Sequence, residues 1–285
     1  MGQSIFQYTV NALAAMGHRP AKKFGQNFLV DMNVVEKFVR FAGLEEGDNV
    51  VEIGPGLATV SREILRYGAK LFAIELDGRL FQFLRDTCGG NKNFNLMRGD
   101  AVEFPIAALD ETCTNYKIVA SLPYAISSPW LESLLECAHL PQSISLIIQL
   151  DAANRFLAPH GTKSFGPMSI FLQSAYRKVA AHKISRNSFY PIPGVDSTMI
   201  FLAKKEAPFL FSRETKRKIR DIFTNRRKQM GKVSRGHGPS VESWLNGNKI
   251  PPSARPEQIP LEAWQDFQVV TTFSSCRWPE MNKFL

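Results

Sequence analysis

Short apolar runs alternate with amphipathic stretches through the first half of the chain. Five runs have the length of buried strands, at residues 49–53, 70–74, 94–97, 117–121 and 144–150. Apolar residues recur at helical spacing in four stretches, at residues 33–41, 59–67, 78–87 and 129–137. Such alternation predicts βαβ units with a mainly parallel sheet, an α/β fold. Ligands of such sheets lie at the carboxyl ends of the strands.

The chain changes character after residue 199. A strand-like run at 199–203 is followed by a basic, helix-like stretch at 213–227, and Pro and Gly become frequent between 236 and 260. The start of the chain, residues 1–20, has the pattern of a helical arm. We therefore expect a main domain over 1–206 that includes this arm, a small helical domain over 207–270, and a tail over 271–285.

The positive charge is concentrated in one segment. The chain of 285 residues carries a net charge of +9, and residues 213–235 hold 10 Lys and Arg against 2 Asp and Glu. A patch of this kind attracts a polyanion such as nucleic acid, and release of counterions makes that binding sensitive to salt. The alternative is an ordinary solvated helix face, which is what most runs of charge are.

Several classes of protein are disfavoured by composition. No apolar run has the length of a membrane span, and the start lacks the features of a secretory signal. The four cysteines, at 88, 113, 137 and 276, form no Cys-x-x-Cys pair, which argues against a zinc ribbon or a disulfide framework. We therefore expect a protein of the cytoplasm, without a metal site and without membrane contact.

The first candidate site combines a glycine turn with two acids. Residues 52–57 read Glu-Ile-Gly-Pro-Gly-Leu, and glycines at a strand end let a ligand approach the backbone closely. Glu75 ends the next strand, 21 residues after Gly54, where a carboxylate can accept from both ribose hydroxyls. Asp100 ends the third strand, where it can accept from an adenine amino group. Each feature alone also fits a plain strand–helix corner or a helix N-cap.

The second candidate site is Ser-Leu-Pro-Tyr at 121–124, after the fourth strand. An exocyclic amino nitrogen of a base is a poor nucleophile because its lone pair is delocalised into the ring. The Ser121 hydroxyl and the Leu122 carbonyl can accept from its two hydrogens and turn the lone pair toward a methyl donor. Tyr124 can stack on a base that has left its helix. The alternative is a Pro-containing turn beside a core tyrosine.

Five segments in order give the chain a family resemblance. Residues 24–29, 52–57, 121–127, 189–197 and 222–228 resemble those of the ribosomal small-subunit RNA adenine dimethyltransferases (the KsgA family). The resemblance runs from about residue 10 to 270. It implies a Rossmann-like class I methyltransferase domain with a small C-terminal helical domain beside it.

The resemblance also implies roles for single residues and for the whole chain. Contacts with S-adenosylmethionine would come from Asn27, Leu29, Gly54, Glu75, Asp100 and Ser121, while Tyr124 and Phe189 would hold the flipped adenine. The family transfers two methyl groups to each of two adjacent adenosines in a hairpin near the 3′ end of 16S ribosomal RNA. The implied partner is the immature small ribosomal subunit, with segment 213–235 on the RNA backbone and the protein acting as a monomer.

The chain departs from the family pattern at three positions. Ser121 stands where the family usually has Asn, and a hydroxyl can donate as well as accept, which puts the rate or the substrate range in question. Ala58 stands where Gly is usual, and Gly194 stands where Lys is common.

Three other functions compete with this one. The same chemistry on large-subunit RNA, of the macrolide-resistance type, is disfavoured by the full-length match and the Arg-Arg-Lys stretch at 226–228. A non-catalytic RNA-binding assembly factor would be supported by Ser121. A nicotinamide oxidoreductase usually has a third glycine, where this chain has Thr59, and needs neither the Ser-Leu-Pro-Tyr motif nor the basic segment.

Overall fold

A computed structural model of the chain describes residues 4–20, 25–237 and 239–267. It divides into two compact units, Met1–Leu210 and Phe211–Leu285. The boundary expected from the sequence lies after residue 206, four residues earlier. The expected tail, at 271–285, lies outside the described residues, as does Cys276.

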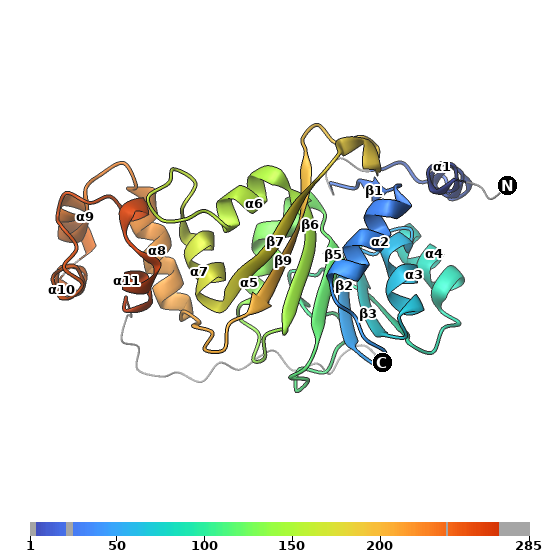
Figure 1. Cartoon of the computed structure of the whole chain (residues 1–285), viewed down its shortest axis with the longest axis horizontal. Helices are drawn as coiled ribbons and strands as arrows, with labels where there is room; N and C mark the ends of the chain where they lie inside the picture. Colours follow the sequence, from blue (N-terminus) through green and yellow to red (C-terminus); the bar gives the residue numbers. More distant parts are fainter. Residues whose placement is uncertain (1–3, 21–24, 238, 268–285) are drawn as a thin grey trace. The chain divides into compact units, whose positions relative to one another are not determined.

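The first unit is built on a seven-stranded sheet with the order β4-β3-β2-β5-β6-β9-β7 (Figure 1). Five strands are parallel, as predicted: β2 (Asn49–Ile53), β3 (Lys70–Glu75), β4 (Phe94–Arg98), β5 (Lys117–Ser121) and β6 (Ser143–Gln149). Two antiparallel strands, β9 (Ser197–Lys204) and β7 (Tyr176–Ile184), complete the other edge. The chain order moves outward from β2 to β4 and then returns to β5, so the strand order reverses between β2 and β5. A ligand site is expected at such a point.

Helix α2 (Met32–Phe41) precedes the first parallel strand, and the other helices of the sheet come after parallel strands. Helix α3 (Thr59–Arg66) follows β2, α4 (Gly78–Cys88) follows β3, α5 (Ser127–Leu134) follows β5, and α6 (Leu150–Phe156) and α7 (Pro167–Ala175) follow β6. The Asp31 carboxylate starts α2 by accepting from the backbone N–H groups of Asn33 and Val34, at 3.1 and 3.4 Å. The same helix buries Val35, Phe38 and Val39, at the spacing of one helix face.

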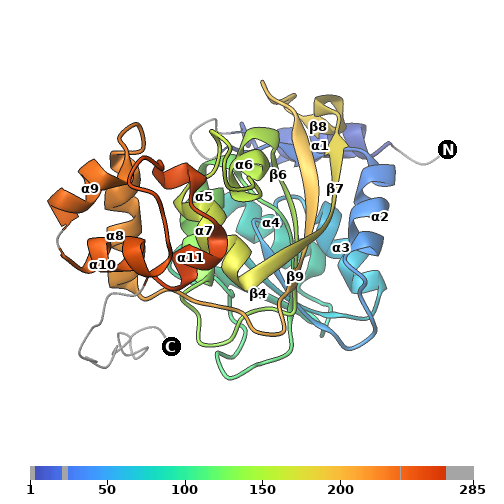
Figure 2. The same cartoon turned by 60° about the vertical axis from the view of Figure 1, so that its left-hand side comes forward.

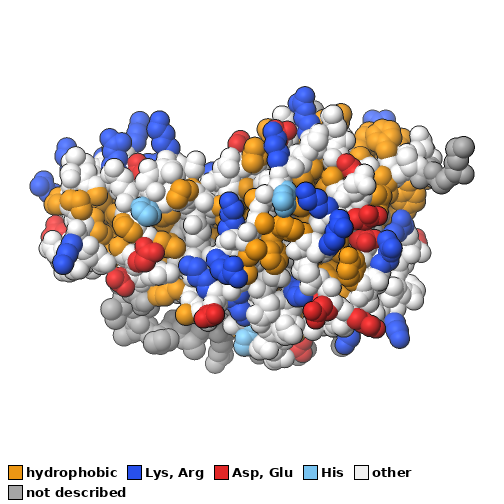
Figure 3. Space-filling view, viewed as in Figure 1, with side chains coloured by type: hydrophobic (Ala, Val, Ile, Leu, Met, Phe, Trp, Pro, Cys, Tyr) orange, Lys and Arg blue, Asp and Glu red, His pale blue; other side chains and the backbone are white. Residues whose placement is uncertain are grey.

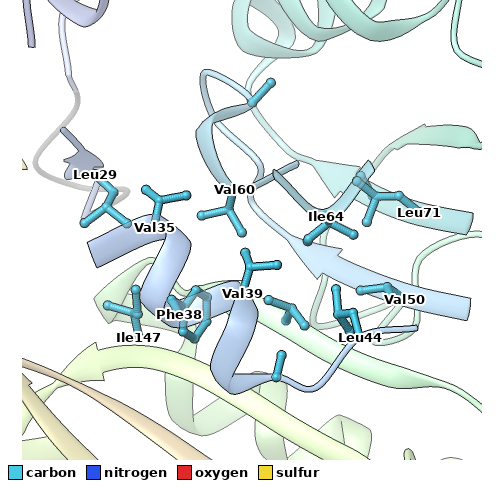
Figure 4. Packing of buried hydrophobic residues seen from close by; sticks show 14 of the residues in the cluster. Leu29, Val35, Phe38, Val39, Leu44, Val50, Val60, Ile64, Leu71 and Ile147 are labelled. Carbon is cyan, nitrogen blue, oxygen red and sulfur yellow. The ribbon is translucent and has the colours of Figure 1, made fainter. Parts of the chain in front are cut away.

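The core of the first unit lies between the sheet and helices α2 and α3 (Figure 4). In this cluster Phe38 and Val39 of α2 pack with Val60 and Ile64 of α3. Val50 of β2 and Leu71 of β3 belong to the same cluster. Most of these side chains are completely buried. Truncation of Phe38, Ile64 or Leu71 to alanine costs about 2–5 kcal/mol, and truncation of one of the smaller valines costs less. This packing holds the carboxyl ends of β2 and β3 in fixed positions.

A two-stranded sheet that the sequence did not predict lies beside the large one. Strand β1 (Phe28–Leu29) pairs antiparallel with β8 (Phe189–Tyr190), so Leu29 faces Phe189 and Phe28 faces Tyr190. A short 3₁₀ turn, η3 (Arg186–Ser188), precedes β8. Runs of two residues carry no periodicity, and their partners lie far apart in the sequence.

The N-terminal arm forms helix α1 (Ile5–Ala15), which ends five residues before Pro20. It lies beside β8 (Figure 2). Leu13 of this helix packs in a small cluster with Phe28, Leu57 and Leu80. The Arg62 guanidinium of α3 donates to the Tyr8 hydroxyl at 2.7 Å and lies 5.1 Å from the centre of its ring. The arm is therefore part of the first unit.

The second unit is helical, as expected. Its elements are α8 (Arg213–Thr224), α9 (Met230–His237), α10 (Pro239–Gly247), η4 (Pro256–Gln258) and α11 (Leu261–Gln265). Its core contains an aromatic group in which the rings of Trp244 and Trp264 lie 4.9 Å apart, with Phe223 and Phe267 beside them. In neither unit does a described helix combine the length and apolar character that crossing a membrane requires.

Candidate active site

An open cavity lies at the carboxyl ends of the parallel strands. All nine residues that the sequence singled out line this cavity: Asn27, Leu29, Gly54, Glu75, Asp100, Ser121, Leu122, Tyr124 and Phe189. They come from six separate stretches of the chain, and the fold brings them to one place. Their individual roles remain predictions.

The glycine turn after β2 packs directly against the Ser-Leu-Pro-Tyr segment. Gly54 and Gly56 have φ angles of +65° and +59°, in the left-handed region. A Cβ atom on Gly54 would lie 3.3 Å from the ring of Pro123, and one on Gly56 would lie 3.2 Å from the ring of Phe28. Ala58 also has a positive φ, 62°, where the family usually has glycine. Both the backbone conformation and the tight space therefore favour glycine at 54 and 56.

Glu75 is held by the backbone of two neighbouring loops. Its carboxylate accepts from the N–H of Gly56 at 3.2 Å and from the N–H of Asp77 at 2.9 Å. The side chain is buried, and this burial raises the pKa of Glu75 to about 7. A carboxylate oxygen has two lone pairs, so donors from a ribose can be added to these bonds.

Glu52 also lines this cavity, but no role was predicted for it from the sequence. It is 2% exposed, and the Ser61 hydroxyl donates to its carboxylate at 2.6 Å. Burial raises the pKa of Glu52 to about 8. The sequence contained a signal for Glu52, which is an acidic residue inside an otherwise apolar strand. Burial of a charged side chain costs free energy, so an acid at such a position indicates a function.

Asp100 lies two residues after the end of β4 and lines the cavity. Its Oδ1 atom accepts from the Val102 N–H at 2.8 Å and so stabilises the turn that follows the strand. No group in the described ranges donates to its second oxygen. This oxygen is therefore available to a ligand.

The segment after β5 presents two acceptors to the cavity. The Leu122 N–H donates to the Ile147 carbonyl at 3.0 Å, which extends the pairing of β5 with β6 by one residue. Within the part of the chain that the structure describes, the Ser121 hydroxyl and the Leu122 carbonyl receive no hydrogen bond. Both residues line the cavity. Two unoccupied acceptors from successive residues can bind the two hydrogens of one amino group.

Tyr124 and Phe189 both line the cavity and are held in place by contacts with the rest of the first unit. Tyr124 begins the 3₁₀ turn η2 (Tyr124–Ile126), its hydroxyl lies 2.6 Å from the Ser197 hydroxyl, and burial raises its pKa above the ordinary value. Phe189 is 2% exposed and packs in the core while it also lines the cavity. Pairing of β8 with β1 brings Phe189 to this site across 160 residues from Leu29.

The loop before β1 closes another side of the cavity. The Asn27 side chain donates to the Gly25 carbonyl at 3.0 Å. Gly25 has a φ of +62°, and a Cβ atom there would lie 3.2 Å from the Tyr124 nitrogen. Phe24, the first residue of the matching motif, lies outside the described residues. The loop thus packs on the segment that carries Ser121.

The basic segment lies in the second unit. On α8 the positions 213, 217 and 220 share one face, all three are arginine, and none of the three is buried. Figure 3 shows further Lys and Arg side chains gathered over the turn between α8 and α9. Lys216 is different, since it is only 2% exposed and belongs to the inner face of the helix. Lys216 therefore does not contribute to a surface for a polyanion.

Comparison with known proteins shows which family the chain resembles. A sequence model described as ribosomal RNA adenine dimethylase matches residues 17–268. The chain is 42% identical to ribosomal RNA small subunit methyltransferase A of Opitutus terrae, over 92% of this chain and 96% of that protein. It is 34% identical to the protein of the same name from Pseudomonas aeruginosa, over 87% and 92% of the two chains.

Solved structures show the same fold at lower identity. A dimethyladenosine transferase from Plasmodium falciparum superimposes with a TM-score of 0.66 at 23% identity, over 83% of this chain and 94% of that one. The 23S rRNA methyltransferase ErmE superimposes with a TM-score of 0.62 at 21% identity, over 84% and 98%. From the match over most of its length and the identity with these relatives, the chain belongs to the ribosomal RNA adenine dimethylase family.

Proposed function

We propose that this protein uses S-adenosylmethionine to dimethylate N6 of two adjacent adenosines in the 3′-terminal hairpin of 16S ribosomal RNA during maturation of the small subunit. The observation that carries the proposal is the pair of unoccupied acceptors on Ser121 and Leu122, in one cavity with Glu75 and Asp100. The names of the curated relatives support the small-subunit substrate.

The adenosine part of the cofactor would bind between the ends of β3 and β4. Glu75 would accept from the ribose hydroxyls, and the second oxygen of Asp100 would accept from the adenine amino group. Gly54 would allow the remainder of the cofactor to approach the backbone, and Asn27 and Leu29 would bound it on the other side. The fixed position of Glu75 supports this assignment, because its two backbone hydrogen bonds orient the carboxylate before a ligand arrives.

The base would be held where the Ser-Leu-Pro-Tyr segment meets β8. Tyr124 and Phe189 would bound the adenine, and the phenol of Tyr124 is anchored by Ser197 at 2.6 Å. The adenine amino group would donate one hydrogen to the Ser121 hydroxyl and the other to the Leu122 carbonyl. These two bonds draw the N6 lone pair out of conjugation and direct it at the methyl carbon.

The bound cofactor would supply an activated methyl group on a sulfonium, so that an N6–CH3 bond forms as the S–CH3 bond breaks. The positively charged N6 produced in this way is acidic enough to lose its proton to water, so the chain needs no strong general base. The residues act by position: two acceptors orient the amine, and two aromatic rings restrict the base. A monomethylated nitrogen still has one hydrogen for one acceptor, and this allows a second transfer at the same site.

The RNA partner would be bound by the second unit as well as by the cavity. The arginines at 213, 217 and 220 would contact phosphates, which fix the substrate without reading its sequence. The immature small subunit is the partner that this proposal implies, with a monomeric protein acting in the cytoplasm.

The test uses immature small subunits from a strain that lacks the modification, incubated with the protein and a cofactor labelled on the methyl group. The proposal expects label on adenosine in the small-subunit RNA. A parallel incubation with large subunits serves as the control. Label in large-subunit RNA would favour the macrolide-resistance type of enzyme, and absence of label from both would favour a non-catalytic assembly factor.

A further inference from the structure

An aromatic residue of the N-terminal arm reaches the surface next to the proposed base site. Phe6 of α1 is 48% exposed, and its ring meets the ring of Tyr190 edge-on, with centroids 5.6 Å apart and planes at 88°. Tyr190 itself is partly exposed. Figure 2 shows α1 beside β8, the strand that carries Tyr190.

The short sheet connects this aromatic pair to the cavity. Successive side chains of a strand point to opposite faces, so Phe189 and Leu29 lie on one face while Tyr190 and Phe28 lie on the other. Phe28, like Phe189, lines the cavity. Tyr190 is thus the strand neighbour of Phe189, on the same face of the short sheet as the cavity-lining Phe28.

Phe6 is only partly buried by the packing of the N-terminal arm. Phe6 lies on the same helix face as Thr9 and Leu13, which are buried. At this end of the face the Phe6 ring meets the ring of Tyr190, and nearly half of the Phe6 surface is open to solvent. Figure 3 shows hydrophobic side chains reaching the surface in this region, beside α1.

The surroundings have the chemistry of a nucleic-acid surface. The loop after β8 exposes Ile192 (61%) and Val195 (42%), while Arg186 is exposed in the turn before β8. Lys183, at the base of this loop, is paired with Asp196 at 2.6 Å, so Arg186 supplies the cation of this surface. Exposed aromatic and apolar groups beside cations are typical of surfaces where bases of a single strand stack.

We propose that Phe6, together with Tyr190, forms a stacking subsite for the nucleobase that adjoins the target adenosine. This inference rests on the proposed function. A base that enters the cavity has left its stack, and its neighbour in the strand thereby loses a stacking partner. An aromatic surface one strand residue from the cavity replaces that partner and holds the second of two adjacent adenosines close to the site.

Kinetics with the immature small subunit test the subsite. The variants are Phe6→Leu, which keeps an apolar side chain for packing but removes the ring, and Phe6→Trp, which keeps a stacking face. We expect Phe6→Leu to raise KM for the subunit about tenfold, with cofactor affinity unchanged, and Phe6→Trp to restore it. Tyr67→Leu is the matched control, because Tyr67 is 37% exposed and ends α3 away from the carboxyl ends of the strands.

The location of the contact is tested by photo-crosslinking. Phe6→p-benzoylphenylalanine is expected to crosslink to the nucleotide that adjoins a methylated adenosine, and the same residue at position 67 is not. A Phe6→Leu enzyme with wild-type KM would overturn the subsite, as would crosslinks only to a ribosomal protein or to distant nucleotides. If the wild-type protein transfers no methyl group at all, the proposed function fails, whereas a fully active Phe6→Leu enzyme removes the subsite alone.

Discussion

The two halves of the cavity differ in how their polar groups are satisfied. On the side of β2 and β3, Glu75 is bonded by the N–H groups of Gly56 and Asp77, and Glu52 by the hydroxyl of Ser61. On the side of β5, the Ser121 hydroxyl and the Leu122 carbonyl have no described donor. The first half is preorganised by the fold itself, and the second half keeps its acceptors for a substrate. Binding and methyl transfer should therefore respond to different mutations.

The largest effect is expected from Gly54→Val. A side chain there combines an unfavourable φ of +65° with a Cβ atom 3.3 Å from Pro123. It should weaken cofactor binding more than about 100-fold, because it displaces the turn and the Pro123 segment together. Calorimetric titration with the cofactor measures this.

Gly43→Val is the control for backbone strain alone. Gly43 has a φ of +60°, and a Cβ atom there would meet nothing within 4 Å. This variant should lose stability but keep cofactor affinity within about twofold. Equal affinity losses in the two variants would show that the contact with Pro123 is irrelevant to binding.

Ser121→Ala should lower the rate of methyl transfer without weakening cofactor binding. We expect kcat to fall about 100-fold, the usual scale for loss of one preorganised polar contact at a reacting centre. Cofactor affinity should stay within about twofold, because the Glu75 half is untouched. Single-turnover methyl transfer and titration measure the two quantities, and Ser128→Ala in α5 serves as the control. A parallel loss of binding and rate would place Ser121 in the cofactor site only.

Cofactor affinity should depend on pH through Glu75. Its pKa is about 7 in the free protein, and hydrogen bonds from ribose hydroxyls favour the ionised form. Binding should therefore be about tenfold weaker at pH 6 than at pH 8. Glu52 and Asp77 lie nearby, so the assignment needs Glu75→Gln, which should flatten this part of the profile. An unchanged profile in that variant would assign the dependence to another group.

The stability of the free protein should have the opposite dependence on pH. Burial raises the pKa of Glu52 from 4.5 to about 8, so between these values the folded state binds more protons than the unfolded state. Stability contributed by this group is then present at low pH and falls as pH rises through about 8. Thermal unfolding should show a lower Tm at pH 8.5 than at pH 6. Glu52→Gln should reduce that difference, and an unreduced difference would contradict the assignment.

The smallest effect concerns the binding of RNA near the loop after β8. Gly194 is exposed, a Cβ atom there would meet nothing within 4 Å, and the family commonly has lysine at this place. Gly194→Lys should tighten binding to the immature subunit about twofold to threefold at low salt and less at high salt. Gly194→Ala controls for the loss of glycine. An effect independent of salt would argue against a phosphate contact.

The sequence predicted the part of the fold that rests on local patterns. The bounds of β2 and β5 are those expected, because each is an apolar run that ends at a turn or a loop. Strand β7 was missed because it is an edge strand whose side chains are mostly exposed, and β1 and β8 were missed because two residues have no period. Strands β1 and β8 also pair with each other across 160 residues, and such distant pairing cannot be read from a local pattern.

Site residues next to an apolar strand could likewise be predicted from the sequence, whereas those positioned by contacts between distant segments could not. Glu75 and Asp100 could be found because each follows an apolar strand directly. Phe189 was placed only by family resemblance, because its position beside Leu29 depends on β1–β8 pairing. Glu52 was visible as a residue of the glycine motif, but its burial and its bond from Ser61 appear only once α3 is placed against β2.

The most direct test of the account is analysis of the product made by the wild-type protein. Immature small-subunit RNA is digested to nucleosides after incubation with the cofactor, and the methylated adenosines are identified by mass spectrometry. We expect N6,N6-dimethyladenosine at two adjacent positions, because a monomethylated N6 still has one hydrogen to donate to Ser121 or Leu122 and can accept a second methyl group. Unmodified adenosine, or N6-methyladenosine alone at saturating enzyme, would contradict it.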